Sequence, residues 1–401
     1  MIGSALVLIW LTINLVFTMS DQFQPILDFI RNYYGKPEGL IGLHEPLFVG
    51  NERAYVMDSI DSTFVSSVGA YVDRFESVMK DYTGALYAVA TVNGTAALHM
   101  AMLLAGVKQH DLVITQPLTF IATCNAISYL GASPLFIDND LKTLGLSAEK
   151  LKSFLVENTK VKNNECIHLA TGKRISACVP MHTFGHPVDL HELVEICMEF
   201  NIPLVEDAAE SIGSRYHGKH TGTFGLVGAF SFNGNKTITC GGGGIVVTNN
   251  EKLGRLAKHL TTQAKIQHPW EFIHDQIGYN YRLPNLNAAL ACAQMEMLDK
   301  FISAKRELAK LYKGFFEKTN LKFVDEPANS FSNFWLNAVL FPNRLERDSF
   351  LEYSNSRKVS ARPAWTLMNK LEMFKECISG DLSNAIDLEN RLVSLPSSVK
   401  L

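Results

Sequence analysis

The stretch Ser231-Phe-Asn-Gly-Asn-Lys236-Thr-Ile-Thr-Cys-Gly-Gly-Gly-Gly244 decides the fold class of this 401-residue chain. It holds a lysine in a tight, glycine-rich loop, and an apolar segment ending in Glu206-Asp207 precedes it. A primary amine in such a loop can condense with an aldehyde, and a carboxylate at the end of a buried strand can keep a pyridine nitrogen protonated. Lys236 and Asp207 together therefore predict pyridoxal phosphate chemistry.

The length and composition of the chain limit its possible domain organisation and binding partners. With 47% hydrophobic and 19% charged residues, the chain is long enough for a large core and a second, smaller one. We expect an N-terminal segment and a large cofactor-binding domain over residues 19–300, then a linking helix and a small C-terminal domain over 301–401. A net charge of -3 without long runs of one sign does not support nucleic-acid binding.

The seven cysteines are scattered, odd in number and free of any C-x-x-C pair. This pattern argues against a disulfide framework and against a zinc site, and no metal is expected. It indicates a reducing compartment, and we expect the protein to be cytoplasmic.

Residues 1–18 carry no charged side chain and are the most apolar stretch of the chain. Their length just suffices to cross a bilayer, but they lack basic flanks and a cleavage pattern of small residues. Met19 follows at once, which favours a translation start there over a real anchor. Both alternatives stay open, and membrane contact is expected only if this extension is an anchor.

Beyond Gly35, strand-like and helix-like segments alternate, which is typical of an α/β fold with a helix-covered, mainly parallel sheet. A long helix is expected from Asn285 to about Thr319, because its apolar residues recur at helical spacing. The expected strands are 88–92, 112–115, 134–138, 177–182 and 202–207.

Several strand ends carry side chains suited to a ligand. Gly94 and Thr95 open a helix whose free N–H groups can bind a phosphate, although a plain strand-to-helix turn is the alternative. Phe120, also near a strand end, can stack on a planar ring or belong to the core. Asp207 can pair with a pyridinium nitrogen and Glu210 with a phenolic oxygen. The alternative for Asp207 is a helix N-cap, and the alternative for Glu210 is an acidic residue in the first turn of a helix.

Two histidines, His182 and His186, follow another expected strand. They can contact substrate or serve as local hydrogen-bonding residues, and their spacing gives no case for a metal.

The ordered set of motifs resembles the DegT/DnrJ/EryC1/StrS sugar aminotransferases from about Leu43 to Val399. The motifs are Gly94-Thr95-Ala96, Phe120-Ile-Ala-Thr, Glu206-Asp207-Ala-Ala, Ser231-Phe232 with Lys236 and its glycine run, and Gly278-Tyr279-Asn280-Tyr281-Arg282. Within the family, Val49-Gly-Asn-Glu52, Ser62-Thr-Phe-Val-Ser-Ser-Val-Gly69 and Trp365-Thr-Leu-Met-Asn369 look like the LegC branch.

This resemblance implies a fold-type-I enzyme, like aspartate aminotransferase, with a large mixed-sheet domain and a small C-terminal α/β domain. It implies a homodimer with shared active sites that moves an amino group from an amino acid, with glutamate expected, to a nucleotide-linked 4-keto-6-deoxy sugar. Legionaminic acid and bacillosamine-type syntheses are the expected settings. The nucleotide, UDP or GDP, and the position, C4 or C3, stay open.

The resemblance also assigns roles. Lys236 would form the covalent link to the cofactor and move a proton to the sugar carbon. Ser231, Gly94 and Thr95 would hold the phosphate, with Asn280 reaching the phosphate of the neighbouring subunit. Glu210 stands where many relatives carry glutamine or histidine. Tyr281, Arg362 and Trp365 join the two histidines as candidates for substrate contact.

A different kind of protein is also possible: a catalytically silent chain of this fold that serves as a binding or regulatory partner. Retention of Lys236 argues against it. A dehydrating offshoot of the family carries histidine at this position, so the lysine argues against that chemistry as well.

Overall fold

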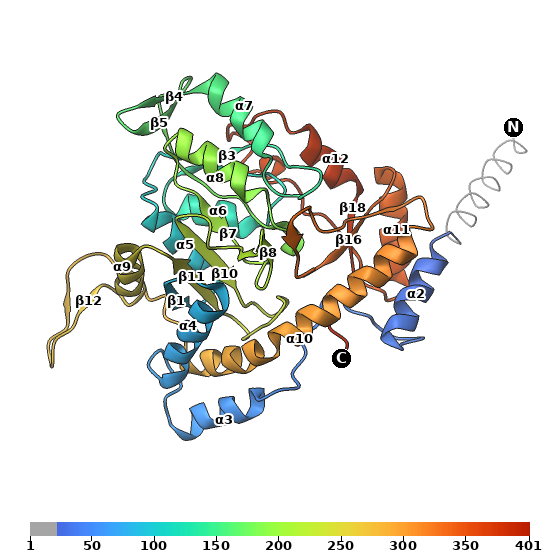
Figure 1. Ribbon diagram of the computed structural model, residues 1–401, viewed down its shortest axis with the longest axis horizontal. Helices are drawn as coiled ribbons and strands as arrows, with labels where there is room; N and C mark the ends of the chain where they lie inside the picture. The colour runs from blue at the N-terminus through green and yellow to red at the C-terminus, as the bar shows by residue number, and fades with distance from the viewer. Residues whose placement is uncertain (1–21) are drawn as a thin grey trace, which may run out of the picture.

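A mixed β-sheet covered by helices on both faces lies at the centre of the molecule (Figure 1). The computed structural model describes residues 22–401, so the extension 1–18 lies outside the described residues. The helices are α2 (Gln24–Tyr34), α3 (Glu52–Asp61), α4 (Ala70–Thr83), α5 (Gly94–Leu104), α6 (Ile121–Tyr129), α7 (Ala148–Asn158), α8 (Leu190–Glu199), α9 (Glu251–Thr261), α10 (Asn285–Phe316), α11 (Arg344–Ser356) and α12 (Ser383–Arg391).

The strands of the central region are β1 (Tyr87–Thr91), β2 (Leu112–Thr115), β3 (Ser133–Phe136), β4 (Thr159–Lys162), β5 (Glu165–His168), β6 (Arg174–Cys178), β7 (Val205–Asp207), β10 (Val227–Ser231) and β11 (Gly244–Thr248). Shorter pairs are β8 (Arg215–Tyr216) with β9 (Lys219–His220) and β12 (Lys265–Ile266) with β13 (Ile273–His274). The C-terminal region adds β14 (Lys322–Phe323), β15 (Ser330–Phe331), β16 (Asn337–Leu340), β17 (Arg362–Pro363) and β18 (Leu392–Leu395).

The central strands form one continuous row. β3, β2 and β6 pair in parallel, and β7, β10, β11 and β1 follow in hydrogen-bonded order. Parallel bridges from Cys178 to Leu204 and from Met181 to Asp207 join the two groups. Within this row β11 runs antiparallel to both its neighbours, so the sheet is mixed, as expected.

Both faces of the sheet are buried because helices cover each of them, and consecutive strand residues point to opposite faces. On β11, Ile245 and Val247 pack with α4 and α10, whereas Val246 packs with α5, α6 and α9. The parallel strands end at one edge, and Asp207 and Ser231 are the last residues of β7 and β10. The helix α5 begins at the same edge, just after β1, so the fold collects the predicted ligand-binding residues there.

The expected long helix is confirmed as α10, which runs from the central sheet to a smaller antiparallel sheet of order β14-β16-β18-β17 (Figure 1). The N-terminal helix α2 packs against this smaller sheet, with Leu27 and Ile30 in the same buried cluster as Phe350 and Val393. The predicted domain boundary at residue 300 stays a prediction. From the packing of α2 we propose that this helix belongs to the small C-terminal domain.

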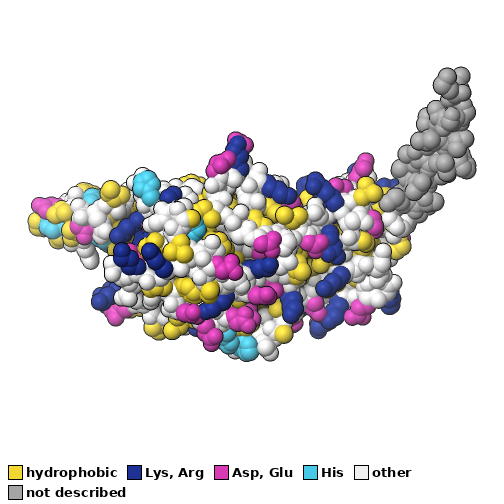
Figure 2. Space-filling model, turned by 90° about the horizontal axis from the view of Figure 1, so that it is seen from above, with side chains coloured by type: hydrophobic (Ala, Val, Ile, Leu, Met, Phe, Trp, Pro, Cys, Tyr) yellow, Lys and Arg dark blue, Asp and Glu magenta, His cyan; other side chains and the backbone are white. Residues whose placement is uncertain are grey.

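No helix among residues 22–401 is both long enough and apolar enough to cross a membrane. An arm containing β12 and β13, residues 262–280, projects from the molecule next to α9 (Figure 1). Its side chains Trp270, Phe272 and Ile277 are at least three-quarters exposed, with fractions of 76%, 81% and 86%. The arm is the projection at the left edge of Figure 2, where hydrophobic side chains are visible.

Candidate active site

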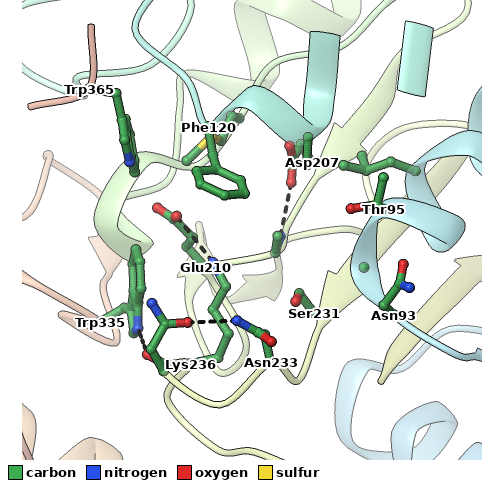
Figure 3. Close-up of a pocket in the computed structure, with 16 residues that line it drawn as sticks. Asn93, Thr95, Phe120, Asp207, Glu210, Ser231, Asn233, Lys236, Trp335 and Trp365 are labelled. Atoms are coloured by element: carbon green, nitrogen blue, oxygen red, sulfur yellow. Dashed lines mark hydrogen bonds and ion pairs between the residues drawn. The ribbon is translucent and has the colours of Figure 1, made fainter. Parts of the chain in front are cut away.

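A cavity of about 290 Å³ lies at the strand-end edge of the central sheet (Figure 3). Of the predicted site residues, it brings together Gly94, Thr95, Phe120, Asp207, Glu210, Ser231, Lys236 and Trp365. The cavity is bounded by the N-terminus of α5 at one end and by Trp335 and Trp365 of the C-terminal region at the other.

The end formed by α5 suits a phosphate. Asn93 caps the helix by accepting a hydrogen bond from the Ala96 amide at 2.8 Å. The amides of Gly94 and Thr95 lie in the first turn, where no intrahelical carbonyl can accept from them. A Cβ on Gly94 would lie 2.6 Å from that of Ser231, so only glycine lets the helix approach the serine so closely.

Asp207 lies deep in the cavity with its carboxylate fixed from two sides. Thr123 donates a hydrogen bond to Oδ2 at 2.7 Å, and the Ala209 amide donates to Oδ1 at 3.2 Å. Burial raises the pKa of Asp207 above its ordinary value, while the two hydrogen bonds and the charge of Lys236 oppose that shift. A cationic ring nitrogen placed here would stabilise the ionised carboxylate further.

The neighbouring Glu206 has a different task, because the strand alternates sides. It accepts hydrogen bonds from the amides of Gly222, Phe224 and Gly225, each at 2.7 Å, and it pairs with His182 Nε2 at 3.2 Å. Burial opposes its charge, but these hydrogen bonds hold the pKa of Glu206 below its usual range. Glu206 therefore anchors the loop before β10.

Lys236 enters the cavity from the loop after β10. Its Nζ lies 3.2 Å from Glu210 Oε1 and 4.2 Å from the centroid of the Trp335 ring. Glu210 also accepts a hydrogen bond from the Phe184 amide at 2.9 Å. The amine is thus held between a carboxylate and an aromatic face, inside the cavity and close to Asp207 (Figure 3).

Phe120 and the tryptophans give the cavity aromatic walls. Phe120 is 48% exposed although it precedes a partly buried helix, and it lines the cavity, so it faces the cavity and not the core. Its ring and that of Trp365 meet edge to face with centroids 6.3 Å apart. A planar ligand can lie against Phe120.

Other predicted residues lie outside this cavity. His182 is buried against Glu206, and His186 is buried beside Phe334 with no hydrogen-bond partner for either ring nitrogen among residues 22–401.

The Tyr281 hydroxyl also lies outside the cavity and contacts His99 Nδ1 at 3.0 Å, and Asn280 is exposed at the base of the arm. Arg362 lines an adjoining cavity. A role for these residues at the site stays a prediction.

Three residues contribute to the site although the sequence did not indicate a role for them: Thr123, Asn235 and Trp335. Thr123 lies within the quoted Phe120 motif but holds Asp207 across a gap of 84 residues. Trp335 lies about 100 residues after Lys236, in an apolar run that resembles any core segment, and its Nε1 donates to the Asn235 carbonyl at 2.7 Å. Only the fold brings it to the lysine.

The residues fit pyridoxal phosphate. The helix N-terminus and Ser231 suit the phosphate, Asp207 suits the ring nitrogen, Phe120 suits the ring face, and Lys236 is the amine for the aldehyde. The mixed sheet with this lysine-bearing loop defines a pyridoxal-phosphate-dependent enzyme of fold type I.

Comparisons with known proteins place the chain within this class. The profile of the DegT/DnrJ/EryC1/StrS aminotransferase family matches residues 48–401, so the chain belongs to that family and is a pyridoxal-phosphate-dependent aminotransferase. It is 36% identical to GDP-perosamine synthase of Escherichia coli O157:H7 over 89% of this chain and 93% of that protein.

Two solved structures share the fold. The aminotransferase TlmJ of Streptoalloteichus hindustanus is 26% identical, with a TM-score of 0.80 over 90% of this chain and 94% of that one. The Escherichia coli GDP-4-keto-6-deoxy-D-mannose-3-dehydratase with bound hydrated pyridoxal phosphate is 22% identical, with a TM-score of 0.79 over 90% of this chain and 96% of that one. The LegC branch stays a prediction.

Glu210→Gln should stabilise the cofactor-free protein more at pH 8 than at pH 5. Burial raises the pKa of Glu210 from 4.5 to about 7, although Lys236 opposes the shift. From about pH 4.5 to 7 the folded state binds more protons than the unfolded state, so the free energy of unfolding falls as the pH rises, by up to about 3 kcal/mol. Glutamine stays neutral and can still accept from the Phe184 amide. Urea unfolding at both pH values measures the difference, and an equal gain at pH 5 and pH 8 would refute the assignment.

Proposed function

We propose that the enzyme transfers an amino group from glutamate to a nucleotide-linked 4-keto-6-deoxy sugar. The observation that carries this proposal is a second cavity, of about 420 Å³, that shares Asn235, Trp335 and Trp365 with the first. Arg362 lies on its wall, where a guanidinium suits a diphosphate. The similarity to GDP-perosamine synthase, whose name states a GDP-linked product, supports a nucleotide sugar as the acceptor.

The cofactor, when bound, supplies an electron sink for the carbon that loses or gains a proton. The protein residues orient and protonate. We propose that Lys236 carries the proton at Nζ, because it is the amine inside the cavity and its side chain is otherwise mostly buried. Asp207, fixed by Thr123, would keep the ring nitrogen protonated. Gly94, Thr95 and Ser231 would hold the phosphate.

The exposed arm supports a homodimer with shared sites. Its apolar side chains Trp270, Phe272 and Ile277 are largely exposed, and Asn280 lies at its base, next to Thr262, with which it forms a bridge. We propose that the arm packs on a second copy, where Asn280 reaches the cofactor phosphate of that copy.

Replacing both Trp270 and Phe272 with serine should shift the protein from dimer to monomer in analytical ultracentrifugation at micromolar concentration. A variant that stays as dimeric as the parent would refute the arm as the interface.

Within this function we propose a legionaminic acid or bacillosamine-type synthesis in the cytoplasm, on the strength of the LegC-like motifs at Val49–Glu52 and Ser62–Gly69. The similarity to GDP-perosamine synthase leaves a GDP-linked acceptor open beside a UDP-linked one. The catalytically silent alternative has less support, because the whole constellation around Lys236 is present.

A coupled assay tests the proposal. The full chain with pyridoxal phosphate and glutamate is offered GDP- and UDP-linked 4-keto-6-deoxyhexoses, and the products are identified by mass and NMR. An amino sugar nucleotide from either acceptor supports the proposal, and the NMR spectrum assigns C4 or C3. If glutamate removes the visible absorption band of the bound cofactor but neither acceptor yields an amino sugar, this choice of acceptor is contradicted.

A further inference from the structure

The second cavity contains a histidine that no motif had suggested. His44 lines it together with Arg362, and three aromatic side chains, Phe184, Trp335 and Trp365, form much of its wall. Both ring nitrogens of His44 are buried and have no hydrogen-bond partner among residues 22–401. Buried polar atoms are nearly always satisfied in folded proteins, and each one left without a partner is costly.

The position of His44 is fixed by the chain around it. The Ser397 amide donates to the Leu43 carbonyl at 2.7 Å, and the Glu45 amide donates to Ser398 Oγ at 2.8 Å. The segment is thus tied on both sides to the C-terminal end of the chain. Because its neighbours are held, His44 presents its ring to the cavity from a defined place.

The charge state of His44 restricts the ligand. Burial, reinforced by the charges of Lys305 and Lys236, lowers the pKa of His44 well below its ordinary value. A neutral imidazole has one N–H donor and one acceptor nitrogen, which matches a hydroxyl or an amide. It does not suit a phosphate, for which Arg362 on the same wall is the better partner.

Resting on the proposed function, we propose that His44 is a specificity-determining residue that hydrogen-bonds a neutral polar group of the sugar ring. The sugar would lie between His44 and Lys236 among the aromatic walls, and the diphosphate would extend toward Arg362. A neutral donor–acceptor residue at this place selects the hydroxyl or amide substituents of the sugar, not the nucleotide.

Binding without turnover tests this proposal. Borohydride fixes the cofactor on Lys236 of the full-length protein, and isothermal titration calorimetry measures the Kd of GDP- and UDP-linked 4-keto-6-deoxyhexoses and of GDP and UDP alone. His44→Phe should weaken the preferred sugar nucleotide about 10-fold, the value of one hydrogen bond, and change the Kd of the free nucleotide less than about twofold. Arg362→Gln should weaken both.

Two further variants guard against a folding artefact. His44→Asn and His44→Gln retain a polar atom near Nδ1 and Nε2 respectively, so one of them should recover part of the affinity. His191→Phe, on α8 outside both cavities, is the matched control and should bind like the parent. Thermal unfolding and cofactor absorbance verify that each variant is folded.

The outcomes of these binding measurements distinguish the role of His44 from the proposed function on which it rests. If the parent binds a sugar nucleotide and His44→Phe binds it equally well, or loses sugar nucleotide and free nucleotide to the same extent, the role of His44 is wrong. If the parent binds neither sugar nucleotide, the proposed function itself fails. A selective loss with recovery by asparagine or glutamine establishes the role.

Discussion

Replacing Lys236 with alanine is expected to lower turnover by at least about 10⁴-fold, because one change removes both the amine for the covalent link and the proton carrier. The rest of the cavity stays in place, since Gly94, Ser231 and Asp207 are held by other elements. The variant should therefore still bind pyridoxal phosphate, but reversibly. Steady-state rates and dialysis of the loaded protein measure the two effects.

The matched control for this substitution is Lys252→Ala. Lys252 is exposed on α9, so its loss should leave the rate within twofold of the parent. Sustained turnover by Lys236→Ala would reject the assignment of this lysine.

The second large effect is expected for Asp207. Asp207→Ala should lower kcat by about 10²- to 10⁴-fold, because the ring nitrogen would lose the charge that keeps it protonated. Asp207→Asn tests the charge alone, since it keeps the volume and can still hydrogen-bond Thr123. We expect the asparagine variant to fall almost as far as the alanine variant.

A separate substitution isolates the support of that carboxylate. Thr123→Val removes the hydrogen bond to Oδ2 but leaves the charge, so we expect a loss of about 10-fold. Near-normal kcat for Asp207→Asn would mean that the charge is not required, and the role given to Asp207 would be wrong.

The sequence predicted the part of the site that is local. Asp207 ends a buried strand and Lys236 lies in the loop that follows another, and parallel strands end at one edge of a sheet, so their proximity follows from the fold class. Gly94 and Thr95 were found for the same reason, at the start of a helix that follows a strand.

The remaining residues of the site are brought there by contacts between segments that are distant in the sequence. Trp335 and His44 reach the cavities only because the C-terminal region folds back onto the central sheet. Nothing in an apolar-aromatic run marks one tryptophan as facing a ligand. The sequence singled out Asp207 but gave no role to Glu206, because only the sheet shows that the Glu206 carboxylate anchors a loop while that of Asp207 faces the cavity.

The most direct test of the central claim is the absorption spectrum of the full-length protein with pyridoxal phosphate, before and after glutamate. We predict a visible band that borohydride traps on Lys236 and that glutamate removes as the cofactor accepts the amino group. A protein that shows no such band, with no cofactor attached to Lys236 after borohydride, would contradict the account and favour a chain that has kept the fold without the chemistry.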